Sequence, residues 1–184
     1  GDSPMSTIKV DTITGKTSDT VDFSGNNNIT QFNKNGNQDT SSASAVLITG
    51  WSQMNSQSNF GFQQVGTAWT ESSGEFATTR LGVYRVYFEC HIQTLTTTGS
   101  RYQQLDIILV PNGGSSIGGD IYSNLPYTGD TTYNLHTRCK IFNITHANDK
   151  IHTRMGSTQN VRIRGDDVND FDTTLTFEWL APPV

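Results

Sequence analysis

The sequence predicts an all-β protein, on three observations. Threonine, serine and asparagine together occupy 58 of the 184 positions. Alanine, leucine, glutamate and lysine, which lose the least rotamer freedom in a helix, occupy only 24. From residue 46 onward, short strand-like runs recur with turn residues between them, a spacing typical of an antiparallel sandwich or barrel rather than a βαβ fold. We therefore expect antiparallel sheets and no sizeable helical part.

The strands are expected in a definite order along the chain. The clearest covers residues 83–92, in which every second side chain is apolar and belongs to the core face: Tyr84, Val86, Phe88, Cys90 and Ile92. The other predicted strands follow it at residues 105–110, 135–144, 150–155, 160–164 and 175–180. Pro-Asn-Gly-Gly ends the first of these and Pro-Pro follows the last, as expected of turns.

The apolar residues are unevenly distributed, which predicts a boundary near residue 45. Residues 1–45 are 22% apolar, whereas residues 46–184 are 37% apolar. Residues 33–44 are polar apart from one alanine, a composition typical of a linker. We expect residues 1–4 to be a cloning remnant ahead of the native methionine. Residues 5–45 would be a low-complexity extended segment for attachment or a shaft, and residues 46–184 the head domain.

Composition also excludes several classes of protein. A net charge of −5 with scattered basic residues argues against a nucleic-acid binder. No window approaches the roughly 18 apolar residues of a membrane-inserted helix. Two cysteines are too few for a disulfide scaffold. No signal peptide is visible, so we expect Cys90 and Cys139 to start as thiols in a cytosol, and whether they later bond stays open.

Residues 46–184 resemble the jelly-roll heads shared by the complement globular-head proteins and the tumour necrosis factor superfamily. The resemblance rests on the order and spacing of four pieces: Gly74-Glu75-Phe76 before the strand that starts at Gly82, the Leu105-x-Ile107-x-Leu109 strand with its Asn-Gly turn, Asn148-Asp149-Lys150-Ile151 where the family has Gly-Asp, and a last strand containing Phe177. It implies an antiparallel jelly-roll β-sandwich that assembles as a homotrimer.

Residues 5–13, Met-Ser-Thr-Ile-Lys-Val-Asp-Thr-Ile, are similar to the start of many virion proteins of marine bacteriophages of the cyanophage kind, particularly fibre and appendage proteins. No collagen repeat precedes the head, unlike in animal complement-type proteins. The resemblance implies a virion protein made in the host cytoplasm. Its N-terminal segment would bind other virion proteins, and its head would bind a host-surface receptor or glycan. Two alternatives stay open: a capsid decoration or assembly protein without a host ligand, and a polysaccharide hydrolase.

The resemblance also implies which side chains lie at the trimer axis. In the family, the strand that follows the glycine runs close to the threefold axis. The face of residues 83–92 that alternates with the core carries Arg85, Tyr87, Glu89 and His91. We expect Arg85 and Glu89 to alternate there as interchain ion pairs. Three copies of His91 would form a pH-sensitive or metal-binding cluster; alternatively, His91 lies off the axis and is solvated.

A tyrosine-containing stretch is the candidate ligand-binding region. Residues 112–133 are rich in glycine and contain Tyr122, Tyr127 and Tyr133. Tyrosine offers a large contact area at a low cost in side-chain entropy. We therefore expect these three residues to contact the host ligand.

An acidic cluster is the candidate metal site within a single chain. It contains Asp166, Asp167, Asp170 and Asp172, whose hard oxygen ligands suit Ca²⁺. The cluster lacks the glycine and the bidentate glutamate of an EF-hand loop, and a solvated acidic turn is the alternative. No other cofactor is expected.

No catalytic site is expected. Gly15-Lys16-Thr17 resembles the end of a phosphate-binding loop, but Val10 stands where that loop needs its first glycine. Cys90 and His91 are adjacent on a strand and point to opposite faces, so they cannot form a catalytic dyad. With only four glutamates, a paired-carboxylate hydrolase is a minority interpretation. The remaining histidines show no metal-ligand spacing and are assigned to surface or edge positions: His136, His146 and His152.

Overall fold

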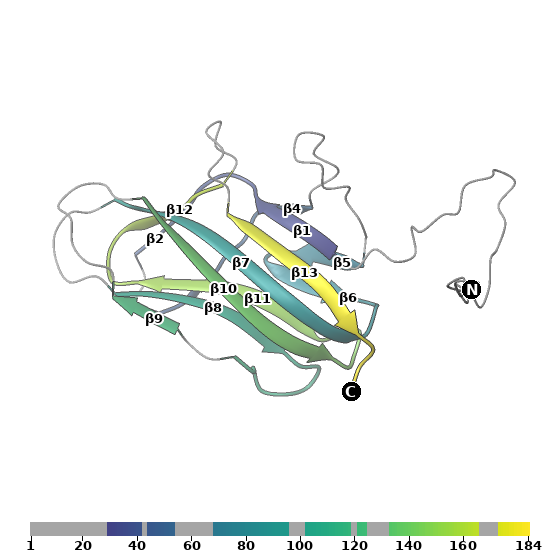
Figure 1. Cartoon of the computed structure of the whole chain (residues 1–184). Coiled ribbons are helices and arrows are strands. Elements are labelled where there is room, and N and C mark those ends of the chain that lie inside the picture. Colours follow the sequence, from purple (N-terminus) through teal and green to yellow (C-terminus); the bar gives the residue numbers. More distant parts are fainter. Residues whose placement is uncertain are drawn as a thin grey trace, which may run out of the picture.

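The computed structural model describes residues 29–41, 44–53, 68–95, 102–118, 121–124, 133–165 and 173–184. The regular elements in these residues are all β-strands (Figure 1). Sheet A contains β1 (Ile29–Lys34), β2 (Gln38–Thr40), β4 (Trp51–Gln53), β7 (Gly82–Thr94), β10 (Tyr133–Ile144), β12 (Val161–Ile163) and β13 (Thr174–Ala181). Sheet B contains β3 (Val46–Leu47), β5 (Trp69–Ser72), β6 (Glu75–Thr78), β8 (Tyr102–Val110), β9 (Ile121–Asn124) and β11 (Lys150–Ser157). The described part of the chain holds no helix that could cross a membrane.

The two sheets stack face to face (Figure 1). Sheet A has the strand order β2-β12-β7-β13-β1-β4, and β10 pairs with the other side of β7 over its whole length. Sheet B has the order β5-β6-β11-β8-β9, with β3 on β11. Every pairing is antiparallel. The prediction of an all-β antiparallel sandwich is confirmed.

Strand β7 forms the centre of sheet A. It pairs with β10 on one side and with β12 and β13 on the other. The apolar side chains that alternate along it are at most 1% exposed, as predicted: Tyr84, Val86, Phe88, Cys90 and Ile92. Burial of this row against sheet B is the hydrophobic term that fixes the register of β7, because a slip of one residue would expose every member.

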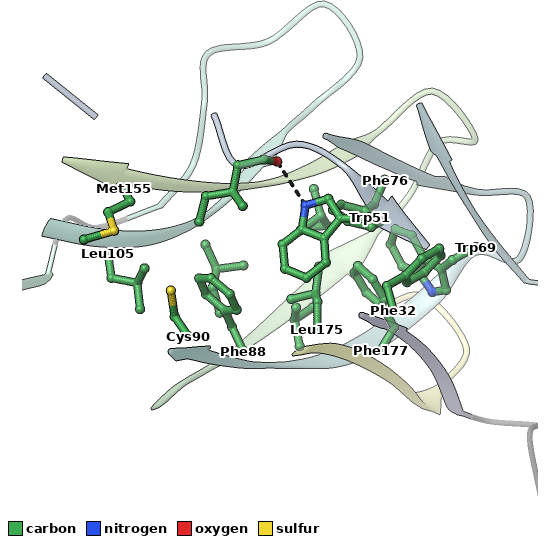
Figure 2. Packing of buried hydrophobic residues seen from close by; sticks show 14 of the residues in the cluster. Phe32, Trp51, Trp69, Phe76, Phe88, Cys90, Leu105, Met155, Leu175 and Phe177 are labelled. Atoms are coloured by element: carbon green, nitrogen blue, oxygen red, sulfur yellow. Dashed lines mark hydrogen bonds between the residues drawn. The ribbon is translucent and has the colours of Figure 1, made fainter. Parts of the chain in front are cut away.

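Aromatic rings fill one end of the space between the sheets (Figure 2). Trp69 of β5 stacks on Phe177 of β13 with ring centroids 4.0 Å apart. Phe76 packs edge-on against Phe32, with centroids 4.9 Å apart. The buried indole of Trp51 donates its N–H to the carbonyl of Ile48 at 3.0 Å, so this polar group is satisfied in the core. Toward the other end the core is aliphatic and sulfur-rich: Cys90, Leu105 and Met155 (Figure 2).

The head begins before residue 46, so the predicted boundary is wrong. β1 lies inside sheet A, where it pairs with β13 from Ile29↔Glu178 to Asn33↔Thr174 and also pairs with β4. Phe32 is 2% exposed. Residues 33–44, expected to be a linker, include the end of β1 and all of β2. The polar composition of this segment predicted a linker, but a polar residue can also be buried in a strand. Lys34 is buried at the end of β1, where its ammonium donates to the carbonyls of Asn35 and Gly36.

A buried carboxylate organises the turn between β10 and β11. Asp149 is 1% exposed. Its Oδ2 accepts the backbone N–H groups of Thr145 and His146, both at 3.0 Å. Its Oδ1 accepts the N–H of Asn112, which follows β8, at 2.9 Å. Burial by itself raises the pKa of Asp149, but the three N–H donors outweigh it and the net shift is downward. Asp149 therefore fixes the ends of three strands at one point.

Candidate functional site

The outer face of sheet A carries the residues predicted for a trimer axis. Arg85, Tyr87, Glu89 and His91 alternate with the buried row of β7 and are half-buried or exposed. Their placement on one outward face confirms the predicted alternation. No threefold axis is present in a single chain, so their role at an axis stays a prediction.

Strands β10 and β13 extend this face on both sides of β7. On β10, Leu135, Thr137, Cys139 and Ile141 lie opposite the outward residues of β7 in register. Ile141 is 63% exposed and Leu135 is 53% exposed. On the other side, Ile29 shares the face through its pairing with Glu178, and its side chain is 45% exposed. We call this surface the sheet A face: the outward residues of β7 and β10 with Ile29, Thr174, Thr176 and Glu178.

Polar contacts within one chain already engage the charged groups of the sheet A face. Arg85 Nη1 lies 3.4 Å from Glu178 Oε2. The hydroxyl of Tyr87 donates to Glu89 Oε1 at 3.4 Å, and the hydroxyl of Thr174 donates to Glu89 Oε2 at 3.3 Å. Burial and the neighbouring Glu89 carboxylate raise the pKa of Tyr87. Two acidic partners are therefore available to Arg85: Glu178 of its own chain, and, as predicted for a trimer, Glu89 of another chain.

The two cysteines lie on opposite sides of sheet A and are both free thiols. Cys90 is buried in the core, where desolvation raises its pKa to about 12. Cys139 is exposed and lies opposite Tyr87 in the register of β10 with β7, in the middle of the sheet A face. A single exposed thiol therefore marks this face.

The structure does not bring the predicted tyrosines together in one sheet. Tyr122 lies in β9 of sheet B, paired with Gln104, and Tyr133 begins β10 of sheet A, paired with Gln93. Tyr127 lies outside the described residues. The predicted Ca²⁺ ligands also lie outside them: Asp166, Asp167, Asp170 and Asp172. Within the described ranges no group of three or more His, Cys, Asp or Glu side chains could hold a metal ion.

The outer face of sheet B carries ion pairs that sequence reasoning missed. Glu75 of β6 accepts a hydrogen bond from Lys150 of β11, and His152 Nε2 lies 3.4 Å from the same carboxylate. The bond from Lys150 lowers the pKa of Glu75. The next residue of β11 on the same face is Arg154, and its Nη2 lies 3.6 Å from the carboxylate of the fully buried Asp106. One sequence pattern indicates a charged outer face here: every second residue of the predicted strand 150–155 is basic, namely Lys150, His152 and Arg154.

A second missed feature is the inner side of β10. This strand pairs with β7 alone, so its other side is an edge of sheet A in the described structure. His136, Arg138 and Lys140 lie on its inward face, at the seam between β10 and β8 of sheet B. His136 is 9% exposed, which corrects the expectation of a surface position, although it does lie on an edge strand. Lys140 Nζ crosses the seam and donates to the carbonyl of Ile107 at 3.0 Å.

The comparisons with known proteins bear on the fold. No protein-family model and no curated protein sequence matches the chain. Among solved structures, Eiger TNF from S. frugiperda superposes with a TM-score of 0.60 at 12% identity, over 85% of this chain and 94% of that one. Murine APRIL crystallised at pH 5.0 gives a TM-score of 0.54 at 12% identity, over 83% and 98%. At such low identity the likeness concerns architecture alone. The described chain therefore has a jelly-roll sandwich of the TNF type.

Proposed function

We propose that this chain is the non-catalytic, homotrimeric head of a bacteriophage fibre or appendage, located in the virion, and that the head contacts the host surface. The observation that supports self-association concerns β10, which turns apolar side chains toward solvent and polar ones toward the other sheet. From Leu135 to Ile141 the outward side chains include exposed Leu135 and Ile141, whereas the inward ones are His136, Arg138 and Lys140; the inward Phe142 and Ile144 follow at the end of the strand. A strand that turns its apolar residues outward exposes them to water unless another chain covers them.

The fold and the N-terminal segment support the remaining parts of the proposal. Proteins with a TNF-like fold typically form trimers. A rigid sandwich with three copies of each loop suits weak surface contacts, because multivalency converts them into strong binding. Residues 5–13 resemble the start of phage virion proteins. In this proposal they attach the head to other virion proteins.

The carboxylates support a non-catalytic role. A glycosidase general acid needs a raised pKa. Neighbouring groups instead lower the pKa of Glu75, through Lys150, and of Asp39, through Arg162. Glu178 is paired with Arg85, and Glu71 accepts the backbone N–H of Gly74 at 2.6 Å. These carboxylates have structural partners in the described part of the chain.

The first test is the oligomeric state of the full chain at micromolar concentration. Light scattering should give three 20.2-kDa chains per particle, and Cys139 should react slowly with a thiol reagent. Ile141→Glu should give monomers in which Cys139 reacts fast. The matched control is Ile117→Glu, since Ile117 is 57% exposed but lies against β8 of sheet B. A monomeric parent protein, or equal effects of both variants, would contradict the proposed interface.

The second test concerns the host surface. A fluorescently labelled trimer should bind cells of a susceptible host and should compete with phage adsorption. A trimer that binds no such cell would contradict the receptor-binding role and would favour a decoration protein.

A further inference from the structure

The turn after β8 contains an asparagine followed by a glycine, Asn112-Gly113, and both residues are exposed. The N–H of Gly114 donates to the carbonyl of Pro111 at 3.1 Å, which closes a four-residue β-turn. Gly113 takes the third position with a φ of +73°, as a type II turn requires, and a Cβ built on it would meet nothing within 4 Å. The turn is therefore open to solvent at Gly113.

The peptide group between Asn112 and Gly113 is held by no hydrogen bond among the described residues. The bonds of this turn lie on either side of it: Asn112 donates its own N–H to Asp149 Oδ1 at 2.9 Å, and Gly114 donates to Pro111. Rotation of the central peptide group interconverts type I and type II turns while the ends of the turn stay in place. The nitrogen of Gly113 can therefore move relative to the side chain of Asn112 without breaking either flanking bond.

The sequence contains one other asparagine–glycine pair, Asn35-Gly36, and there the peptide group is clamped. Asn35 is also exposed, and Gly36 also has a positive φ, of +67°. The ammonium of the buried Lys34 donates to the carbonyl of Asn35 at 3.3 Å and to the carbonyl of Gly36 at 2.9 Å. The carbonyl of Asn35 belongs to the same peptide group as the nitrogen of Gly36. This group therefore cannot rotate without breaking a hydrogen bond to a charged donor.

We propose that Asn112 is a site of spontaneous deamidation in the folded head, and that Lys34 protects Asn35 from the same reaction. The nitrogen of Gly113 loses its proton to a base in solution and forms a bond to the side-chain Cγ of Asn112, whose amide group leaves as ammonia. Water then opens the cyclic imide at either of its two C–N bonds and leaves an aspartate or an isoaspartate. The net reaction consumes one water and releases one ammonia. This inference does not depend on the proposed function.

The product adds a negative charge at the point where Asp149 fixes the ends of three strands. Asn112 donates its N–H directly to Asp149, so the new carboxylate belongs to a residue that is bound to an existing carboxylate. Like charges at such short range repel each other. An isoaspartate also lengthens the main chain of the turn by one carbon atom. The converted chain should therefore unfold at a lower urea concentration than the parent.

The test is incubation of the full chain at pH 8, followed by digestion and mass spectrometry of both asparagine–glycine pairs in the same sample. In the folded chain Asn112 should convert at least about tenfold faster than Asn35, because Asn35 must first break a hydrogen bond to a charged group. In concentrated urea the two rates should become similar, because both asparagines precede a glycine and the clamp is gone. Asn112→Gln should remove the acidic form that ion exchange separates from the parent, since glutamine would have to close a larger ring.

The matched variant is Lys34→Met, which keeps the buried aliphatic stem and removes the ammonium. Asn35 should then convert at a rate approaching that of Asn112, whose own rate should stay unchanged. If this variant does not fold, the comparison of the two pairs in the folded parent still decides. The proposal is overturned if Asn112 stays intact in the folded parent but converts in urea, if Asn35 converts there as fast as Asn112, or if folded Lys34→Met leaves Asn35 protected. An unchanged urea midpoint of the acidic form would overturn its expected effect on Asp149.

Discussion

Replacement of Asp149 is expected to destabilise the head more than replacement of any exposed carboxylate. The side chain is 1% exposed and accepts three backbone N–H groups, from Thr145, His146 and Asn112. In Asp149→Asn one carboxylate oxygen becomes an NH₂ group. Whichever way the amide turns, that group faces at least one N–H donor that it cannot accept.

The magnitude follows from these contacts. A buried donor left unsatisfied costs roughly 1–3 kcal/mol, and the bonds that remain lose their charge assistance. Asp149→Asn should therefore lower the free energy of unfolding by about 2 kcal/mol. Asp149→Ala, which removes all three bonds, should lower it by about 4 kcal/mol. The matched control is Asp39→Asn, since Asp39 pairs with Arg162 at 2.7 Å on the surface, and such exposed pairs contribute at most about 1 kcal/mol.

Urea unfolding between pH 3 and pH 8 measures both effects. The folded-state pKa of Asp149 is lowered, so its ionised form stabilises the head fully above the unfolded-state pKa of about 3.9, and that contribution is lost as the pH falls through the folded-state pKa. The gap between parent and Asp149→Asn should therefore narrow below about pH 4. Equal losses for Asp149→Asn and Asp39→Asn at pH 7 would refute this account.

Three further predictions concern the sandwich itself. A chain of residues 29–184 should unfold cooperatively on heating, whereas residues 46–184 should not, because the shorter chain lacks β1; equal transitions would contradict the corrected boundary. Gly82→Ala should destabilise by about 2 kcal/mol in urea unfolding, since Gly82 has a φ of +153° and a Cβ there would overlap the indole of Trp179 and the backbone carbonyl of Ala181; an unchanged midpoint would contradict this account. Phe177→Ala should cost about 4 kcal/mol because it empties the stack with Trp69, and a loss below about 1 kcal/mol would mean that the core collapses around it.

The sequence predicts strands best where one face is clearly apolar. The alternation in residues 83–92 identified both faces of β7, because that strand has neighbours on both sides and a single buried row. β1 was not predicted because its third buried position is occupied by a lysine, Lys34. Two backbone carbonyls accept hydrogen bonds from its ammonium, and no local sequence pattern indicates them. A boundary drawn from apolar content alone therefore fell within the sheet.

Strand β10 shows why the candidate site was only partly predictable. Residues 135–144 were recognised as a strand, but alternation alone would assign Leu135 and Ile141 to the core. The structure turns them outward because Phe142 and Ile144 occupy the inward positions at the other end of the strand. The contact of Lys140 with the carbonyl of Ile107 joins strands 33 positions apart, and it depends on how the sheets stack.

The inward charges of β10 have a consequence for how this protein assembles. Among the described residues, β10 (twelve residues) pairs with no strand other than β7, and an edge strand of a sheet is a template for the endless strand addition of fibrils. A chain that added itself here would have to cover Arg138, whose guanidinium donates to the carbonyl of Thr137 on this strand, and charges are costly to remove from water. Growth in the plane of the sheet is therefore blocked, while face-to-face contact across the outer surface remains open. In the proposed trimer, copies of the chain would therefore meet through their outer faces rather than by adding strand to strand.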